Sequence, residues 1–156
     1  MASLGEKHLQ RLGVTYSVHS YDYRKKGAAA AAEALGLDVA ATLKSLVIRL
    51  PGPRFIFFLV PGDASLSMRK LARSLGERSA ELASERDAER LTGYRVGGMG
   101  PFGSRNALPV YVDLSALEHD TVYVNGGRRG LLLGMDPEAL VEAAQAEVLD
   151  VARLED

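Results

Sequence analysis

The sequence predicts an α+β domain built on a mixed, curved β-sheet. Helix-like and strand-like segments interleave in the first part of the chain, whereas pairs of strands joined by short turns dominate the second part. The chain has 156 residues, of which 47% are apolar and 25% charged, and this is ordinary for a globular domain with one core. We therefore expect residues 1–156 to form a single domain, and a doubly wound parallel sheet is less consistent with the hairpins.

The first two predicted elements are a helix and a strand. Residues 3–13 have the capping-box spacing of Ser3 and Glu6 at the start, and Gly13 is a typical stop at the end. Residues 14–21 then alternate apolar and polar side chains with a period of two, as in a strand with one buried face.

The middle of the chain predicts three helices and a hairpin. The alanine-rich segment 28–36 favours a helix that ends at Gly36. Residues 45–50 and 54–60 are rich in β-branched and aromatic side chains, and the Pro-Gly-Pro between them indicates a hairpin-like connection. Two further helices are expected over 67–76 and 84–93, each with a serine cap, Ser67 and Ser84.

The last part of the chain predicts mostly strands. Residues 108–113 and 121–125 are short β-rich runs, and Gly126-Gly127 indicates a hairpin turn into 128–134. Asp136 followed by Pro137 is a helix start, and this helix should run to about Ala146. A short closing strand over 147–152 completes the prediction.

Composition excludes several classes of function. The chain has no Cys, so it can form neither disulfides nor thiolate metal sites. Its three histidines, His8, His19 and His119, have no metal-ligand spacing, and we expect neither a metal nor a cofactor. No segment approaches the roughly 18 apolar residues of a membrane span, and the first residues do not form a signal peptide. We therefore expect a cytoplasmic protein without a membrane partner.

The charge pattern leaves a local nucleic-acid contact open. A net charge of −1 argues against non-specific coating of nucleic acid. Positive residues nevertheless cluster at 24–26, at 69–73 and at 128–129. Each cluster is either a solvated surface patch or a phosphate contact, and arginine suits the latter role.

The glycine-rich segment 91–113 contains a G-x-G-x-x-G pattern at Gly98, Gly100 and Gly103. A dinucleotide site would need a helix directly after it, but Pro101 lies inside the pattern and a loop and strand follow. A phosphate-binding P-loop also fails, because no Gly-Lys-Ser/Thr closes the motif. The segment is then either a tight turn or a loop that presents backbone amides to an anion.

Three motifs together resemble a known family. They are TLKSLVIRL around Lys44, the loop T-G-Y-x-V-G-G-x-x-P-x-G that begins at Thr92, and the hairpin G-x-R-G that begins at Gly127. In this order and at these separations they resemble the YbaK/ProX group of aminoacyl-tRNA deacylases, which is also the editing domain inserted in many bacterial prolyl-tRNA synthetases. The resemblance covers nearly the whole chain, including the segment HSYDYR that contains Tyr21.

The resemblance implies a barrel-like sheet and hydrolysis of the ester between a wrong amino acid and tRNA. The partners that it implies are the acceptor end of an aminoacyl-tRNA, most readily of proline tRNA, and a prolyl-tRNA synthetase. It implies that Lys44 is the catalytic residue. The substrate-binding positions that it implies are Tyr21, Ser45, Gly98, Met99, Gly100, Pro101, Phe102, Gly103, Asn125, Gly126, Gly127 and Leu132.

Two departures from the family pattern concern the amino acid that is removed. This chain has Leu132 where cysteine-specific members carry Asp, and Asn125 where many members carry Ser. We expect Lys44 and loop amides to stabilise the oxyanion of ester hydrolysis, with water or a substrate group as the attacking nucleophile. The alternative is a non-catalytic module of the same fold that binds an aminoacyl-tRNA or an amino acid.

Overall fold

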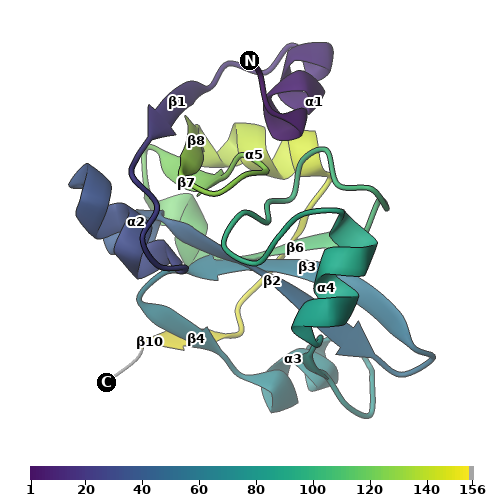
Figure 1. Cartoon of the computed structure of the whole chain (residues 1–156). Coiled ribbons are helices and arrows are strands. Elements are labelled where there is room, and N and C mark those ends of the chain that lie inside the picture. Colours follow the sequence, from purple (N-terminus) through teal and green to yellow (C-terminus); the bar gives the residue numbers. More distant parts are fainter. Residues whose placement is uncertain (155–156) are drawn as a thin grey trace.

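The computed structural model describes residues 1–154 and confirms a mixed α+β architecture (Figure 1). The helices are α1 (Leu4–Leu12), α2 (Ala28–Leu35), α3 (Met68–Ser74), α4 (Glu85–Thr92) and α5 (Pro137–Ala144), with short 3-10 turns η1 (Val39–Ala41) and η2 (Leu114–Glu118). The strands are β1 (Ser17–Ser20), β2 (Leu43–Leu50), β3 (Arg54–Pro61), β4 (Ala64–Leu66), β5 (Glu81–Leu82), β6 (Val110–Asp113), β7 (Val122–Asn125), β8 (Leu131–Met135), β9 (Glu147–Leu149) and β10 (Ala152–Leu154).

The predicted helix caps are present. In α1 the Ser3 hydroxyl accepts a 3.1 Å hydrogen bond from the Glu6 amide, and the Glu6 carboxylate accepts a 2.9 Å bond from the Ser3 amide. Gly13 ends α1 in the left-handed conformation, with φ of 70°. The hydroxyls of Ser67 and Ser84 cap α3 and α4. These bonds satisfy amides at the helix starts that have no partner within the helix.

A five-stranded sheet forms the centre of the molecule. Its strand order is β5-β2-β3-β6-β9, in which β2 pairs antiparallel with β5 and β3. The pairs β3–β6 and β6–β9 are parallel. The sheet is therefore mixed, as the sequence predicted.

Two smaller sheets complete the strands. One is three-stranded and antiparallel in the order β1-β8-β7, and the other pairs β10 with β4. A single parallel bridge between Thr42 and Tyr123 joins the start of β2 to β7. Because one bridge does not continue into a ladder, the strands of residues 1–154 do not close into a barrel. The mixed α+β fold is confirmed, and its strands form three sheets without a closed barrel among residues 1–154.

The central sheet buries both of its faces. Phe57 and Leu59 of β3 belong to a core that also includes Leu131 and Leu133 of β8. Residues of β3 that point the other way join a second core with Leu71 of α3. This alternation explains why β3 is apolar from Phe55 to Pro61 and not only at every second position.

The main differences from prediction occur in short strands. The first strand covers only Ser17–Ser20. Val14 and Tyr16 precede it and pack against the first core, but they have no strand partner. The short strands β4, β5 and β10 were not predicted. Each has three residues or fewer, so a period of two is hardly visible in the sequence. Within residues 1–154 no helix is long and apolar enough to cross a membrane.

Candidate functional site

A cavity of about 370 Å³ lies where β2 separates from β7. It brings together residues from α2, β2, the loop after α4, β7 and β8, which are distant in the sequence. The predicted site residues that line it are Tyr21, Lys44, Ser45, Met99, Asn125 and Leu132. Its other lining residues are Lys26, Gly27, Ala28, Ala31, Thr42, Leu43, Leu46, Val96 and Gly97.

The Thr42–Tyr123 bridge explains how Lys44 reaches this cavity. Lys44 and Asn125 each lie two residues beyond the bridge on adjacent parallel strands, so their side chains point to the same face. The Lys44 Nζ atom donates a 2.6 Å hydrogen bond to the carbonyl oxygen of Ala64 in β4. This bond orients the half-buried ammonium group at the edge of β2.

Asn125 connects two segments that border the cavity. Its Nδ2 atom donates a 3.2 Å hydrogen bond to the carbonyl oxygen of Gly97. Its Oδ1 atom accepts bonds from the amides of Gly127 and Arg128, at 2.7 and 3.1 Å. Asn125 therefore fixes the β7–β8 hairpin against the loop after α4. This role depends on an amide, which has both donors and an acceptor.

Tyr21 and Leu132 complete the wall on the other side. The Tyr21 amide donates a 2.9 Å hydrogen bond to the carbonyl oxygen of Gly130, which holds the tyrosine beside β8. Burial raises the pKa of the Tyr21 phenol above its usual value, so the phenol stays a neutral donor and acceptor at neutral pH. Leu132 is only 4% exposed and supplies an apolar surface.

The glycine loop contributes less of the cavity than the resemblance implied. Gly98, Gly100, Pro101 and Phe102 are buried in the protein and do not line the cavity, and neither does Gly103. The Gly98 amide donates to the carbonyl oxygen of Arg95 at 2.8 Å. The Gly103 amide donates to His8 Nδ1 at 2.9 Å. These two amides are thus used inside the protein, and the cavity is lined instead by Val96, Gly97 and Met99.

Close packing explains why glycine occurs in this loop. A Cβ atom on Gly100 would lie 2.0 Å from the carbonyl oxygen of Asn125, and one on Gly98 would lie 2.7 Å from the Arg129 amide. Phe102 behind them is 1% exposed, and its carbonyl oxygen accepts a 2.7 Å bond from the Tyr94 hydroxyl. The glycines therefore let the loop pack directly on the β7–β8 hairpin.

Gly126 and Gly127 form the turn of that hairpin and lie outside the cavity lining. The Gly126 amide donates a 3.0 Å bond to the carbonyl oxygen of Leu131, and its own carbonyl oxygen accepts a 2.7 Å bond from the Ser3 hydroxyl. Gly127 has φ of 101°, a conformation that favours glycine. These residues support Asn125 through the backbone.

Sequence reasoning missed the contribution of α2. Ala28 and Ala31 line the cavity, and their spacing of three places them on one face of the helix. Small side chains on that face leave room for the cavity beside β2. The alanine run of this helix is the visible signal in the sequence, but alanine indicates helix propensity whichever face is packed.

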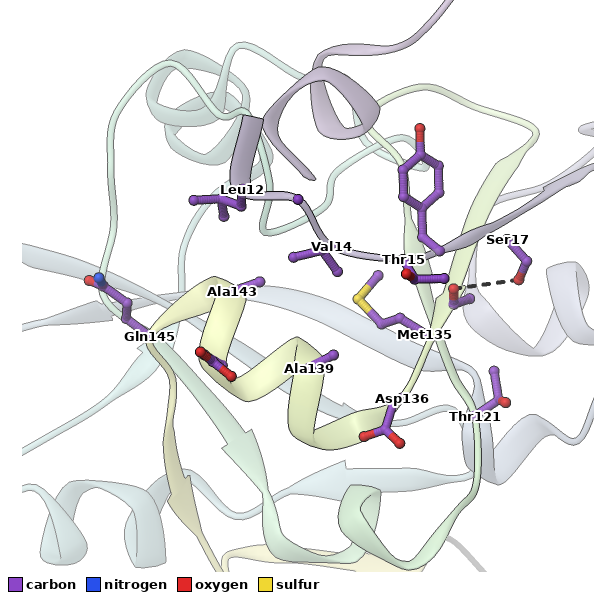
Figure 2. Close-up of a pocket in the computed structure, with 14 residues that line it drawn as sticks. Leu12, Val14, Thr15, Ser17, Thr121, Met135, Asp136, Ala139, Ala143 and Gln145 are labelled. Carbon is purple, nitrogen blue, oxygen red and sulfur yellow. Dashed lines mark hydrogen bonds between the residues drawn. The ribbon is translucent and has the colours of Figure 1, made fainter. Parts of the chain in front are cut away.

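A larger hollow of about 820 Å³ lies elsewhere, between the α1–β1 connection and α5 (Figure 2). Leu12, Val14 and Thr15 line one side of it, and Ala139 and Ala143 of α5 line the other. No predicted site residue borders it, and its lining contains neither lysine nor arginine. Across residues 1–154, no three His, Cys, Asp or Glu side chains gather as a metal site.

Two of the three basic clusters lie near the rim of the smaller cavity. Lys26 lines it directly and pairs with Glu85 at 3.4 Å. The hairpin residue Arg129 donates a 3.0 Å bond to the carbonyl oxygen of Val96, and its guanidinium carbon is 5.1 Å from the centroid of the Tyr23 ring. The third cluster belongs to α3, beyond the opposite face of the central sheet (Figure 1).

Comparisons with known proteins show the family of the chain. Residues 24–143 match the family model described as "Aminoacyl-tRNA editing domain". The chain is 29% identical over 126 residues to the "Putative Cys-tRNA(Pro)/Cys-tRNA(Cys) deacylase EbsC" of Enterococcus faecalis, an alignment that covers 80% of this chain and 76% of the relative. It is 38% identical over 96 residues to the "Proline--tRNA ligase" of Trichlorobacter lovleyi, covering 62% of this chain but 16% of the ligase.

A solved structure shares the fold over almost its whole length. It is described as "Crystal structure of a putative trans-editing enzyme for prolyl tRNA synthetase" and superimposes with a TM-score of 0.87 at 28% sequence identity. The match covers 96% of this chain and 95% of that one. The sequence and fold matches thus define an editing module, and part of a proline–tRNA ligase is similar to it. The chain belongs to the aminoacyl-tRNA editing domain family.

Proposed function

We propose that this protein is a trans-editing deacylase. It hydrolyses the ester of a mischarged aminoacyl-tRNA, with cysteinyl-tRNA(Pro) or another small aminoacyl-tRNA(Pro) as substrate. The observation that carries the proposal is the cavity at the edge of β2. There the Lys44 ammonium lies among apolar walls and the Asn125 amide, in a chain of the editing domain family.

The chemistry follows from the groups that line the cavity. Attack on the ester carbonyl carbon produces a tetrahedral oxyanion. The ammonium group of Lys44, which lines the cavity, stabilises this negative charge. A preorganised donor of this kind contributes about 3 kcal/mol to transition-state stabilisation. The carbon–oxygen bond to the terminal ribose then breaks, and the ribose oxygen takes up a proton. The products of attack by water are the free amino acid and the uncharged tRNA.

The attacking group comes from outside the protein. Among residues 1–154 the cavity lining contains no His, Asp, Glu or Cys, and its one serine, Ser45, points away from Lys44 and so has no general base beside it. An activated nucleophile needs such a base within hydrogen-bond reach. Water or a functional group of the substrate is the consistent nucleophile, and Lys44 with the backbone positions the ester.

Cavity size and polarity favour a small side chain. A volume of about 370 Å³ is sufficient for a small aminoacyl group with part of the terminal ribose. Leu132, Leu46 and Met99 make the walls apolar, so a charged side chain would lose its hydration without a partner. The basic residues at the rim, Lys26 and Arg129, would meet phosphates next to the acceptor end.

A panel of mischarged tRNAs tests the proposal. We expect purified protein to release amino acid from cysteinyl-, seryl- or alanyl-tRNA(Pro) and Lys44→Ala to reduce kcat about 100-fold. Lys7→Ala, on the exposed face of α1, is the matched control and should retain wild-type rates. If Lys44→Ala and wild type release amino acid equally, the catalytic role of Lys44 is wrong. Tight binding without release would instead support the binding-module alternative.

Dependence on a partner needs a separate measurement. A prolyl-tRNA synthetase could supply the tRNA selection that a module of this size lacks. We expect its addition to lower the KM for mischarged tRNA(Pro) and to leave kcat unchanged. An unchanged KM over a range of synthetase concentrations would exclude this partnership.

A further inference from the structure

Ser45 carries a buried hydroxyl group that has no hydrogen-bond partner. Among residues 1–154, only two buried side-chain polar atoms lack a hydrogen-bond partner, namely Ser45 Oγ and Asp63 Oδ1. Buried hydroxyls in proteins are almost always hydrogen-bonded, because an unpaired one has lost its hydration without compensation. Ser45 lines the cavity, so a bound molecule can supply the missing partner.

The position of Ser45 on β2 determines what it can reach. Side chains alternate along a strand, so Ser45 points to the face of Leu43 and Val47, opposite to Lys44. The cavity nevertheless touches both residues, because the edge of β2 is unpaired here. The neighbouring strand β5 pairs only with Ile48 and Arg49. A ligand that passes over this edge can contact the ammonium at one end and the hydroxyl at the other.

The surroundings of Ser45 within the cavity are apolar. Leu43 is 4% exposed, and Leu46 and Met99 are partly buried in the two cores. A single hydroxyl in an apolar wall discriminates between ligands by polarity more than by size. Sites built to hydrogen-bond a ligand hydroxyl reject the analogue that lacks it, whereas one methylene more or less changes affinity only modestly.

We propose that Ser45 is a specificity-determining residue that hydrogen-bonds the side-chain hydroxyl or thiol of the aminoacyl group. The site then prefers seryl or cysteinyl esters to the ester of 2-aminobutyrate, which is close to them in size but has no polar side-chain atom. This inference rests on the proposed function, in which the cavity holds the aminoacyl ester beside Lys44.

The kinetic test compares two substrates and two proteins. We expect wild type to show a kcat/KM about tenfold higher for seryl-tRNA(Pro) than for 2-aminobutyryl-tRNA(Pro), as one neutral hydrogen bond allows. Ser45→Ala should remove this preference by lowering the seryl value alone, and its melting temperature should not fall. An equal loss on both substrates, or an unchanged ratio, would overturn the specificity role.

A binding test separates this inference from the proposed catalysis. Seryl and 2-aminobutyryl groups joined to 3′-amino-3′-deoxyadenosine by an uncleavable amide are titrated calorimetrically into wild type and Ser45→Ala. We expect wild type to prefer the seryl conjugate about tenfold and Ser45→Ala to bind both alike. If neither conjugate binds, or wild type binds both alike, the inference fails. If the preference holds but no aminoacyl-tRNA is hydrolysed, the deacylase proposal fails and the inference about Ser45 stands.

Discussion

Lys44 and Ala64 are joined by a 2.6 Å hydrogen bond from the lysine Nζ atom to the alanine carbonyl oxygen. Ala64 belongs to β4, whose one strand partner within residues 1–154 is β10, and Ala64 pairs there with Leu154. The buried carboxylate of Asp113 in turn accepts bonds from the amides of Val151 and Ala152, at 3.0 and 2.8 Å. The place of the Lys44 ammonium therefore depends on how the C-terminal strand is held.

We expect Asp113→Asn to lower the free energy of unfolding by about 2 kcal/mol, because an amide nitrogen cannot accept the bonds from Ser115 that the second carboxylate oxygen now accepts. Urea unfolding of both proteins at neutral pH measures this difference. Ser65→Ala, at a partly exposed site on β4, is the control. A loss below about 0.5 kcal/mol, the size of ordinary surface effects, would contradict the role of Asp113.

The Asp113 network should also make stability depend on pH. Burial by itself raises the pKa of Asp113, but the hydrogen bonds from Ser115, Ala152 and Val151 outweigh it and hold the pKa below 3.8. A depressed carboxyl pKa stabilises the fold above the unfolded-state pKa, and this contribution is lost as the pH falls through the folded-state pKa. We expect the difference between wild type and Asp113→Asn to shrink below about pH 4. A difference that is constant across the acid range would be inconsistent with this assignment.

His8 predicts a second pH effect, in a higher range. Its Nδ1 atom accepts the amide hydrogen of Gly103, and burial, with a smaller effect of Arg11, lowers the pKa of His8 below 6.5. The neutral ring is favoured in the folded state, so its stabilisation is present above pH 6.5 and is lost as the pH falls through the lower folded-state pKa. We expect His8→Gln to flatten the decline of unfolding free energy between about pH 7 and 5, while His119→Gln keeps the wild-type slope.

Gly100 is expected to tolerate no side chain. A Cβ atom there would lie 2.0 Å from the backbone oxygen of Asn125, so Gly100→Ala must push the loop away from the hairpin. We expect a loss of about 3 kcal/mol in unfolding free energy together with reduced activity, since Asn125 borders the cavity. Gly36→Ala is the control. Gly36 has φ of 66° but no neighbouring atom within 4 Å, so about 1 kcal/mol of backbone strain is expected.

The basic rim should affect substrate binding more than the chemical step. We expect Lys26→Ala with Arg129→Ala to raise the KM for mischarged tRNA about tenfold at low salt, and the salt dependence of binding should become weaker. The paired control is Arg69→Ala with Lys70→Ala on α3, which should leave the KM unchanged. An equal effect of both pairs would place the tRNA on a different surface.

Much of the fold could be predicted because its signals are local. Capping serines, glycine stops and apolar alternation act within a few residues, and Ser67, Ser84 and Gly13 end or begin helices as expected. The pairing of β4 with β10 could not be predicted, because it depends on contacts between segments more than 80 residues apart. The division of the strands of residues 1–154 into three sheets is likewise a property of long-range pairing.

The candidate site could likewise be predicted from the sequence only in part. The motif resemblance identified Lys44 and Asn125, which the structure places at one cavity. It did not reveal that Gly98 and Gly103 use their amides inside the protein, because bond partners such as His8 come from remote elements. The cavity surface formed by Ala28 and Ala31 was hidden for a related reason. Alanine indicates a helix in any environment, and only packing shows which face remains open.

The contacts of α1 and β10 determine which residues a functional fragment of this protein must contain. The family model covers residues 24–143, whereas Ser3, which bonds the Gly126 carbonyl, and Ala152, which pairs with Leu66, both lie outside that range. A recombinant fragment trimmed to the matched range would lose the support on both sides of the cavity. Inactivity of such a fragment would report missing scaffolding and would say nothing about chemistry.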